Sequence, residues 1–574
     1  MAKLLPYMKK YRIFAILAPL FVVLEVLGDI ILPYLMSLIV DIGVKNQNIQ
    51  YIIKIGIIMI IATMLSMLSG IISAHLSAKA GHGFAAEIRK ETFKRIQGFS
   101  FENLNDFTVS SLVTRLTNDC NIIGQVTMMS LRLAIRAPFM MSFDLAMAFR
   151  INSSLARIFL ISIPFTTIII LIVILKARPL FLKLQTKVDE VNSVVRENLT
   201  AIKVVKSFNR QKYEEIKFKK RNDSLRDTAL EALSLIISIM PVLNLVIFST
   251  IIAILWFGGQ QIIVGSMESG ELIAFITYVT QILIMLMLMS MFFMQFLRGI
   301  ISIERIVEVW STKSQIIQIE NPVQKLNDGS VVFNDVGFCY PGCHEETLKN
   351  INFNIKAGEI LGIIGPTGSS KTTLVQLISR LYDVTEGSVV VGGTDVRNYD
   401  IKLLREQVAF VLQKNTLFSG TIRENMLWGD ERASDEKIIK VLKQAQAWEF
   451  VSKYDDTLDH IVEQGGSNFS GGQKQRLTIA RALMKDPKII ILDDSTSAVD
   501  AATNAKIQLA FKEELADITT IIIAQRISSI QYADRIMVMH EGKIESFGDH
   551  STLLDISPIY REIYESQKKG RVGQ

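Results

Sequence analysis

The segment GPTGSSKTTLV, residues 365–375, nearly matches the phosphate-binding pattern G-x-x-x-x-G-K-S/T. Gly365, Lys371 and Thr372 fit the pattern, whereas Ser370 stands where the second glycine belongs. In such a loop, backbone N–H groups cradle phosphate oxygens, the lysine reaches the β- and γ-phosphates, and the threonine hydroxyl holds Mg²⁺. Serine costs little at this place if its backbone is helical, whereas a positive φ is expensive, so we expect binding to be retained. The predicted phosphate-binding residues are Gly365, Pro366, Thr367, Gly368, Ser369, Ser370, Lys371, Thr372 and Thr373.

The flanking sequence supplies the strand and the helix that a phosphate loop requires. EILGIIG (359–365) is a short β-branched run, and residues 371–381 suit a helix whose N-terminus adds partial positive charge. Downstream, KIIILDD (488–494) is an apolar strand that ends in two acids. Asp493 is placed to hold Mg²⁺, directly or through water. Many NTPase families share these parts. The segment FSGGQKQR (469–476), which precedes the acidic strand, reduces the number of families that fit.

With FSGGQ in this position, the chain resembles an ABC exporter half-transporter, in which a six-helix membrane domain is fused to an ATP-binding cassette. The resemblance covers almost the whole chain. It implies ATP and Mg²⁺ as cofactors and a head-to-tail dimer, in which the signature of one subunit closes over ATP held by the other. It assigns adenine stacking to Tyr340 and contact with Mg²⁺ and the γ-phosphate to Gln413. Alternatively, Tyr340 is a half-buried surface aromatic and Gln413 a solvated strand end.

The same resemblance assigns roles to two further segments. SAVD (497–500) resembles the loop that joins the two nucleotide sites of a dimer. The signature that contacts ATP across the dimer comprises Ser470, Gly471, Gly472 and Gln473.

Besides Ser370, two residues depart from the family pattern. Asp494 stands where the family normally has the Glu that polarises the attacking water, and Gln525 stands where it has a His that contacts the γ-phosphate. Asp is one methylene shorter than Glu, and a misplacement of about 1 Å can cost roughly 10²-fold in rate. Gln cannot take up a proton as His can. We therefore predict that Asp494, Gln525 and Lys371 form a catalytic site that binds ATP but hydrolyses it slowly.

An intact signature beside altered hydrolytic residues resembles the heterodimeric class of ABC exporters. We expect a second half-transporter subunit to carry the catalytic Glu and the switch His, while this chain supplies the signature to that subunit's site. Two alternatives stay open: a homodimeric slow exporter of lipids or peptides, and an ABC protein that uses ATP to gate or regulate a partner. A soluble ABC ATPase of the chromosome or repair type would lack membrane spans, and an importer usually keeps its membrane domain on a separate chain.

The apolar residues, which make up 49% of the sequence together with aromatic and Cys residues, fall mostly before residue 300. A membrane crossing takes about 20 helical residues. The third predicted span is the least uniform because it carries Arg132, Arg136 and Asp144. The six predicted spans lie near 13–35, 52–76, 131–149, 155–175, 233–257 and 271–297.

The charges of the connecting segments predict the topology. The long segments 77–130 and 176–232 are rich in Lys and Arg, which marks the cytoplasmic side. The first span is too long for a signal peptide and lacks a small-residue cleavage site, so we expect a retained helix. Six crossings then place both termini and the cassette in the cytoplasm of a multi-pass protein of the cell membrane.

Two stretches and a linker complete the predicted organisation. Residues 85–99 and 188–208 have helical apolar spacing, so they extend membrane helices into the cytosol. Residues 311–330 lose the long apolar pattern and contain Pro and Gly, so we expect a membrane domain over 1–310, this linker, and a cassette over 331–574. The predicted fold class is an all-α six-helix membrane exporter domain with long cytoplasmic helix extensions, followed by an α/β P-loop ATP-binding cassette with a helical subdomain.

The composition excludes two other functions. The net charge of +6 is modest, and the densest basic run, KFKKR (217–221), lies between apolar stretches, so we expect no nucleic-acid partner. The three cysteines, Cys120, Cys339 and Cys343, give no disulfide framework and fit a reducing compartment. CYPGCH (339–344) is a weak zinc signal, because structural zinc takes about four ligands.

The resemblance also indicates how ATP would move substrate. ATP can drive opening to the outside only by binding the closed cassette dimer more tightly than the open one. The segments that would couple the cassettes to the membrane helices are DFTVSSLVTRLTND (106–119) and SFNRQKYEEIKF (207–218).

Ionisable residues within the spans bear on the substrate. Glu25 and Asp29 lie at i, i+4 on one face of the first span, and Asp144 lies in the third. Such groups usually face a cavity or a partner. An acidic cavity would favour lipophilic cations, so small amphipathic compounds of the multidrug type are the leading expectation. Alternatively, the acids pair with Arg132, Arg136 or the other subunit, and lipids, peptides and glycolipids stay open as substrates.

Overall fold

The computed structural model describes residues 3–343, 345–494 and 501–572, and the chain divides into two compact units. The helical unit contains Met1–Gln97 and Val109–Thr312. The cassette unit contains Gly98–Thr108 and Lys313–Gln574. The sequence predicted one uninterrupted membrane domain over 1–310, so the place of Gly98–Thr108 in the cassette unit is a difference from that expectation.

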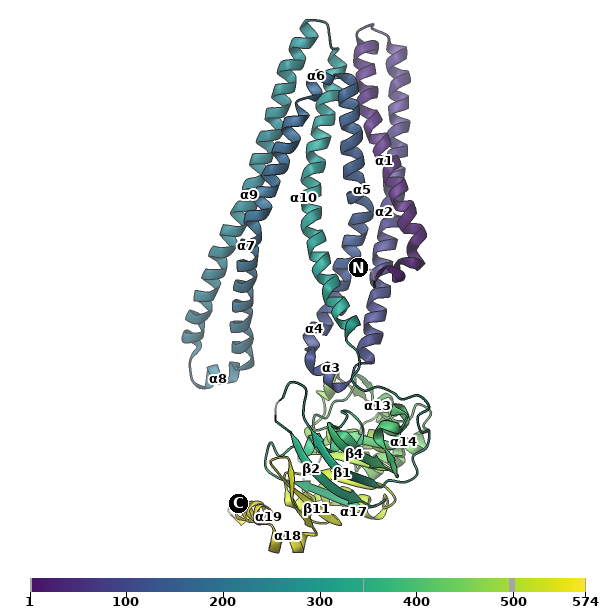
Figure 1. Cartoon of the computed structure of the whole chain (residues 1–574), viewed down its shortest axis with the longest axis vertical. Coiled ribbons are helices and arrows are strands. Elements are labelled where there is room, and N and C mark those ends of the chain that lie inside the picture. Colours follow the sequence, from purple (N-terminus) through teal and green to yellow (C-terminus); the bar gives the residue numbers. More distant parts are fainter. Residues whose placement is uncertain (1–2, 344, 495–500, 573–574) are drawn as a thin grey trace. The chain divides into compact units, whose positions relative to one another are not determined.

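The described part of the helical unit is built on six long helices (Figure 1). They are α1 (Arg12–Leu38), α2 (Ile49–Gln97), α5 (Cys120–Ile151), α7 (Phe159–Thr200), α9 (Gln211–Ile263) and α10 (Ser269–Ser311). The short element η1 (Leu5–Tyr11) precedes α1. The other short elements lie between the long helices: η2 (Ile39–Val44), α4 (Val109–Thr114), η3 (Arg115–Asp119), α6 (Ser153–Ala156) and α8 (Ile202–Ser207). The continuous course of α2 confirms the predicted helical extension through 85–97, whereas the second predicted extension breaks after Thr200.

Among the described residues, five helical segments are long and apolar enough to cross a membrane. They are Leu5–Val44, Ile49–Gln97, Ser153–Thr200, Gln211–Ile263 and Ser269–Ser311. The helix α5 coincides with the third predicted span, and Arg132, Arg136 and Asp144 make it less apolar. Its crossing therefore stays a prediction.

The helices of this unit pack in two groups. The helices α1, α2, α5 and α10 contact one another, and Val22, Ala137 and Tyr278 are fully buried between α1, α5 and α10. The helices α7 and α9 run side by side and are joined by α8 at one end (Figure 1). Outward residues such as Leu245 and Trp256 on α9 are exposed, as expected of faces that meet lipid or another protein chain.

The cassette unit is built around a six-stranded sheet of order β12-β11-β3-β10-β9-β6. The strands from β11 to β6 are parallel to their neighbours, and β12 pairs antiparallel at one edge. All residues of β3, β9 and β10 are buried, as expected for parallel strands covered on both faces. The bounds are β3 (Ile360–Ile364), β6 (Val408–Val411), β9 (Ile489–Asp493), β10 (Thr519–Ile523), β11 (Arg535–His540) and β12 (Lys543–Gly548).

Two smaller sheets and a set of helices complete this unit. An antiparallel sheet of order β2-β1-β4-β5 contains β1 (Val331–Phe338), β2 (Leu348–Ile355), β4 (Glu386–Val391) and β5 (Thr394–Asp395), and β7 (Gly420–Thr421) pairs with β8 (Ile461–Val462). The helices are α3 (Phe101–Asp106), α11 (Lys371–Ile378), α12 (Ile401–Gln407), α13 (Ile422–Leu427), α14 (Asp435–Gln444), α15 (Trp448–Val451), α16 (Gly471–Leu483), α17 (Ala501–Glu513), α18 (His550–Ile556) and α19 (Pro558–Val572). The predicted strands at 359–365 and 488–494 and the predicted helix from Lys371 are confirmed.

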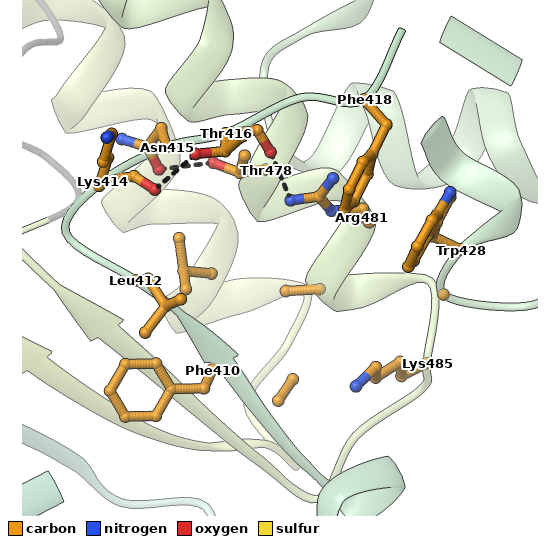
Figure 2. A pocket seen from close by; sticks show the side chains of 14 residues that line it. Phe410, Leu412, Lys414, Asn415, Thr416, Phe418, Trp428, Thr478, Arg481 and Lys485 are labelled. Atoms are coloured by element: carbon orange, nitrogen blue, oxygen red, sulfur yellow. Dashed lines mark hydrogen bonds between the residues drawn. The ribbon is translucent and has the colours of Figure 1, made fainter. Parts of the chain in front are cut away.

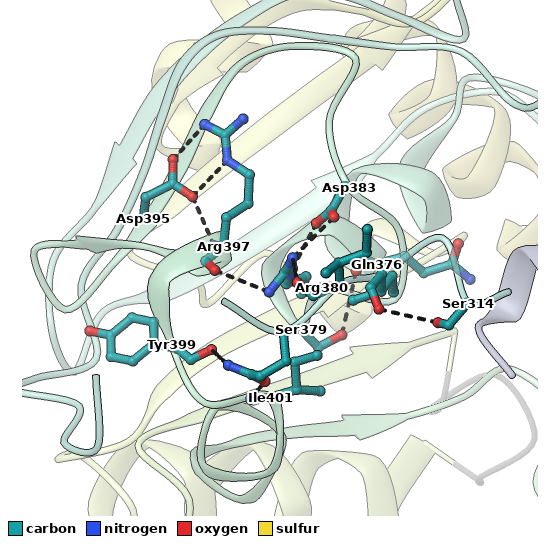
Figure 3. A network of polar contacts seen from close by, with 12 residues as sticks. Ser314, Gln376, Ser379, Arg380, Asp383, Asp395, Arg397, Tyr399 and Ile401 are labelled. Atoms are coloured by element: carbon teal, nitrogen blue, oxygen red, sulfur yellow. Dashed lines mark hydrogen bonds and ion pairs between the residues drawn. The ribbon is translucent and has the colours of Figure 1, made fainter. Parts of the chain in front are cut away.

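A buried polar network holds the segment that follows α10 against the cassette (Figure 3). The Arg380 side chain, which is 3% exposed, forms an ion pair with Asp383. It also donates hydrogen bonds to the carbonyl oxygens of Ile317 and Arg397, each at 3.1 Å. Because a buried guanidinium is costly unless it is paired, this network fixes the end of the phosphate-loop helix and the linker together.

Candidate nucleotide site

A cleft of about 490 Å³ lies at the carboxyl ends of β3 and β9. Parallel strands end at the same edge of a sheet, which is why segments far apart in the sequence meet there. Ser369 does not line the cleft: it is buried, and its hydroxyl donates to the Pro366 carbonyl at 2.9 Å. The lining residues are Ile364, Gly365, Pro366, Thr367, Gly368, Ser370, Lys371, Thr372, Thr373, Gln413, Asp493, Asp494, Ile523, Gln525 and Ile563.

The loop before α11 has the shape of a phosphate cradle. A Cβ atom at Gly365 would lie 2.1 Å from the Met539 carbonyl oxygen, so only glycine fits there. Gly368 has a φ of +86°, which glycine adopts without strain. Lys371 Nζ donates to the carbonyl oxygens of Gly365 and Pro366 at 2.9 and 2.8 Å. Burial lowers the pKa of Lys371, and the nearby acids oppose this shift.

Ser370 has the costly backbone conformation. Its φ is 68° and its ψ is 23°, in the left-handed region, directly before α11. The sequence left two cases open, a helical backbone at which serine costs little and a positive φ that is expensive, and the structure shows the expensive one. A left-handed conformation costs a non-glycine residue roughly 1–2 kcal/mol. The loop nevertheless keeps the fold of a phosphate cradle, because its other glycines and the start of α11 impose that conformation.

The predicted metal-holding residues supply hard oxygen atoms. Thr372 Oγ1 donates to Asp493 Oδ1 at 3.1 Å. Burial raises the pKa of Asp493, and the hydrogen bond from Thr372 opposes this shift. Gln413, which follows β6, is exposed and lines the same cleft. A hydroxyl, a carboxylate and an amide oxygen around one cleft fit Mg²⁺, which prefers oxygen ligands.

The two residues at which the sequence departs from the expected hydrolytic pattern contact each other. Gln525 Nε2 donates to Asp494 Oδ2 at 2.8 Å. The backbone of Gln525 is held as well, because its carbonyl oxygen accepts a hydrogen bond from the Gln567 side chain of α19 at 2.8 Å. The pair therefore lies at the edge of the cleft in a fixed arrangement.

Tyr340 lies next to the cleft rather than in its lining. Its hydroxyl shares a hydrogen bond with Thr373 Oγ1 at 3.0 Å. Its ring packs edge-on against Phe338 and Tyr382, with centroids 4.9 and 5.3 Å apart. An aromatic face is thus fixed beside the phosphate-loop helix, which suits the predicted stacking on a base.

Sequence reasoning missed a contact between the cassette and the segment ahead of residue 106. Phe101 in α3 packs against Tyr382 with ring centroids 6.3 Å apart, and Asn105 Nδ2 donates to the Tyr382 hydroxyl at 3.1 Å. The predicted coupling segment, 106–119, begins at the end of this helix. A signal was available, because Ser100 and Asn103 form a capping box that marks a helix start.

The predicted signature caps α16. Ser470 Oγ accepts from the Gln473 backbone, and the Gln473 side chain accepts from the Ser470 backbone. None of Ser470, Gly471, Gly472 and Gln473 lines the cleft of its own chain. The predicted connecting loop, 497–500, lies outside the described residues.

A second hollow of about 330 Å³ is lined by residues on both sides of Gln413 in the chain, and by residues in and after α16 (Figure 2). Phe418 and Trp428 stack on each other with centroids 4.1 Å apart, and both are exposed. Arg481 lies over Phe418 and donates to the Thr416 carbonyl at 2.9 Å. This aromatic groove gives the segment after Gln413 a surface on which another polypeptide can pack.

The acids of the first predicted span are paired. Arg136 donates to Glu25 and, at 2.8 Å, to Asp29, and Ser66 Oγ donates to Asp29 at 2.7 Å. Asp144 is fully buried, and neither of its carboxylate oxygens has a hydrogen-bond partner among the described residues. The pairing with Arg136, one of the two alternatives drawn from sequence, is confirmed, so two of the three acids do not offer free negative charge.

Comparison with known proteins identifies the family that each unit matches. Residues 15–287 match the family described as the ABC transporter transmembrane region, and residues 348–497 match the ABC transporter family. The ABC transporter ATP-binding protein YfiB of Bacillus subtilis is 37% identical over 99% of this chain and 98% of its own length. The chain belongs to the ABC transporter family. It is an ABC-type ATPase subunit of an ATP-driven membrane exporter, and such exporters work as dimers in the lipid bilayer.

Other members of the family extend the comparison. The ATP-dependent lipid A-core flippase of Desulfotalea psychrophila is 31% identical over 85% of each chain. A solved structure of a bacterial Atm1-family ABC exporter with ATP bound superposes with a TM-score of 0.81 over 98% of both chains, at 23% sequence identity. The predicted fold class, a helical membrane exporter domain followed by an ATP-binding cassette, is confirmed by this likeness.

Proposed function

We propose that this ABC transporter chain is the weak-site subunit of a heterodimeric exporter. Its cleft holds Mg·ATP through the phosphate loop, Thr372, Gln413 and Asp493, with Tyr340 against adenine. The observation that carries the proposal is the hydrogen bond between Gln525 and Asp494. In this pair a shortened carboxylate and an amide replace the groups expected to polarise water and contact the γ-phosphate.

The position of the signature supports a division of labour between two chains. Ser470–Gln473 is complete and well capped, yet it lies outside its own cleft. This placement supports contact with nucleotide held by another cassette. The partner subunit would supply the catalytic Glu and the switch His, and hydrolysis there would reset the transporter while the site of this chain stays occupied.

The proposed location is the cell membrane, with both termini and the cassette in the cytoplasm. Five apolar helical segments, the predicted crossing by α5, and the basic segments between them support this topology. The cassette would bind ATP from the cytoplasm, so its cytoplasmic location agrees with this topology.

We propose small amphipathic compounds as substrates. Arg136 pairs with Glu25 and Asp29, whereas Asp144 has no counter-charge among the described residues, so preference for lipophilic cations rests on Asp144 alone of the three acids first considered. An amphiphilic lipid is the second candidate, and the similarity to a lipid A-core flippase favours it.

ATPase measurements with and without the partner test this function. The purified chain alone in lipid nanodiscs should hydrolyse ATP slowly, and co-purification with its half-transporter partner should raise turnover by about 10²-fold, the penalty assigned to a misplaced carboxylate. Robust turnover by the chain alone would show instead a homodimeric exporter. Proteoliposomes of the dimer that hydrolyse ATP without accumulating substrate would favour a regulatory ABC protein.

A further inference from the structure

Two thiols flank the aromatic residue beside the nucleotide cleft. Cys339 and Cys343 lie on either side of a tight turn, in which the Cys343 N–H donates to the Tyr340 carbonyl at 3.0 Å. Gly342, with a φ of +77°, allows the turn to reverse the chain. The segment resembled a weak zinc site in the sequence, and its second His or Cys pair is absent among the described residues.

The Cys339 thiol is integrated into this turn. Its Sγ lies 3.0 Å from the Cys343 carbonyl oxygen, 3.4 Å from that of Glu345 and 3.5 Å from that of Tyr340. The single thiol hydrogen is a weak donor with three carbonyl acceptors within reach, so the sulfur lies on the inner side of the turn. The sulfur therefore already lies against the backbone of the residue that carries the second thiol.

The two thiols differ in access, as an attacking and a resolving cysteine would. Cys343 is exposed and Cys339 is half-buried. The remaining cysteine, Cys120, is fully buried in α5, and its replacement by Ala leaves Cys339 and Cys343 as the thiols that peroxide can modify.

We propose that Cys339 and Cys343 form a thiol-modification site whose oxidation to a disulfide weakens the binding of the adenine base at Tyr340. The proposal rests on the proposed role of Tyr340 in ATP binding. The oxidant would belong to the hydroperoxide class, to which an exposed thiol in the cytoplasm is open.

The chemistry balances in two steps. The Cys343 thiolate attacks a peroxide oxygen, which forms a sulfenic acid and, from hydrogen peroxide, releases hydroxide that takes up the thiol proton as water. The Cys339 sulfur then attacks the Cys343 sulfur, and the sulfenic hydroxyl leaves with the second thiol proton as another water. Two thiols lose two electrons and two protons, and one peroxide is reduced to two waters.

The disulfide would act on Tyr340 through the turn. Cys339 would lose the hydrogen that it donates to a carbonyl of the turn, and its sulfur would move to that of Cys343. Tyr340 lies between the two sulfurs in the chain, and its ring position depends on one hydrogen bond to Thr373 and edge contacts with Phe338 and Tyr382. Loss of one base–aromatic stack corresponds to a roughly tenfold loss of affinity.

Binding measurements on the full chain in nanodiscs test the proposal. The Cys120→Ala background is treated with hydrogen peroxide, quenched, and titrated with ATP and with tripolyphosphate before and after dithiothreitol. We expect a Cys339–Cys343 cross-link by peptide mass mapping, about tenfold weaker ATP binding that dithiothreitol reverses, and unchanged tripolyphosphate binding, because the phosphate loop is not altered. Cys343→Ser and Cys339→Ser should each bind ATP with the affinity of the reduced chain after peroxide treatment.

The outcomes separate this proposal from the proposed function. If Tyr340→Ala weakens ATP binding in the reduced chain but the cross-linked chain binds ATP normally, the thiol proposal fails and the nucleotide site stands. If Tyr340→Ala leaves ATP binding unchanged, the assigned adenine contact fails and the thiol proposal falls with it. Equal loss of ATP and tripolyphosphate binding on oxidation would show general damage and would also overturn the proposal.

Discussion

Gln525 donates its side-chain amide to Asp494, with 2.8 Å between Nε2 and Oδ2. One carboxylate oxygen is therefore satisfied by a neutral donor that cannot accept a proton. The two side chains also match in length, since the Gln525 amide reaches the Asp494 carboxylate at hydrogen-bond distance. Residues in direct contact seldom act additively, so restoring either family residue alone would break a matched pair.

We predict that Asp494→Glu and Gln525→His together convert this chain into a self-sufficient ATPase. A homodimer of the double variant would contain a catalytic Glu, a switch His and an intact signature at each site. Turnover of the purified chain should rise by roughly 10²-fold, which steady-state phosphate release would measure.

Each single variant serves as the matched control for this prediction. Asp494→Glu alone and Gln525→His alone should raise turnover much less than the double variant. Fast phosphate release by the unaltered chain that is lost on Asp494→Ala would contradict the weak-site assignment.

Ser370 is predicted to be a strained position rather than a neutral one. Its φ of 68° costs a non-glycine residue about 1–2 kcal/mol, and the larger unfolded-state entropy of glycine offsets part of what relieving this strain would gain. Ser370→Gly should therefore stabilise the nucleotide-free cassette by about 1 kcal/mol and retain ATP binding. Thermal unfolding checks this, with Ser370→Ala as the control that removes the hydroxyl but keeps the strain. A lower midpoint for Ser370→Gly would show that the hydroxyl contributes more than the strain costs.

The pattern of neighbouring residues predicted those parts of the site that depend on residues close together in the sequence. The phosphate loop, the strand ending in Asp493 and the cap at Ser470 follow from residues close in sequence, and the parallel sheet then brings them to one edge. The φ of Ser370 was beyond prediction, because the surrounding loop imposes it. The pairing of Arg136 with two acids of α1 was one of several possibilities open from the sequence, and only the packed helices select it, since long-range partners leave no local signal.

We expect the contact of α3 with Tyr382 to couple the cassette to transport without contributing to nucleotide binding. Phe101 and Asn105 both reach Tyr382, which in turn packs against Tyr340. Phe101→Ala should leave ATP affinity within about twofold, because Phe101 does not line the nucleotide cleft and the lost aromatic contact, worth about 0.5–1.5 kcal/mol, contributes to the packing of α3. Stimulation of ATPase activity by transported compounds in the dimer should be strongly reduced.

The same short helix offers a matched control for that experiment. Leu104 lies on α3 like Phe101, but its side chain is exposed. Leu104→Ala should therefore leave the stimulation of ATPase activity unchanged. Loss of ATP binding in Phe101→Ala would show that α3 supports the cassette fold rather than coupling.

The aromatic groove of Figure 2 is predicted to receive a segment of the partner subunit. Trp428 is 63% exposed although it stacks on Phe418. An exposed stack of this kind adds little to the stability of an isolated cassette. Trp428→Ala should lower the ATPase activity of the dimer at least tenfold, as expected of a buried aromatic interface anchor worth about 2 kcal/mol or more. The thermal midpoint of the isolated chain should stay nearly unchanged. An equal loss of stability in the isolated chain would assign Trp428 to the fold instead.

Arg136 is predicted to stabilise the helical unit through its two acids. Its side chain is 24% exposed and bridges Glu25 and Asp29, so Arg136→Gln would remove the close counter-charge of both carboxylates and leave Glu25 only the longer contact with Arg132. Removing one partner of a buried ion pair costs about 3–5 kcal/mol, and partial exposure places the expected loss of stability at the lower end of that range.

Arg132 is the matched control, because it lies one helical turn away, its side chain is 39% exposed, and its distance of 3.9 Å from Glu25 makes a weaker ion pair. Arg132→Gln should cost less than about 1 kcal/mol in thermal unfolding of the chain in nanodiscs. Neutralising both acids, by Glu25→Gln and Asp29→Asn, should restore part of the stability lost in Arg136→Gln; equal effects of the two arginine substitutions would contradict this assignment.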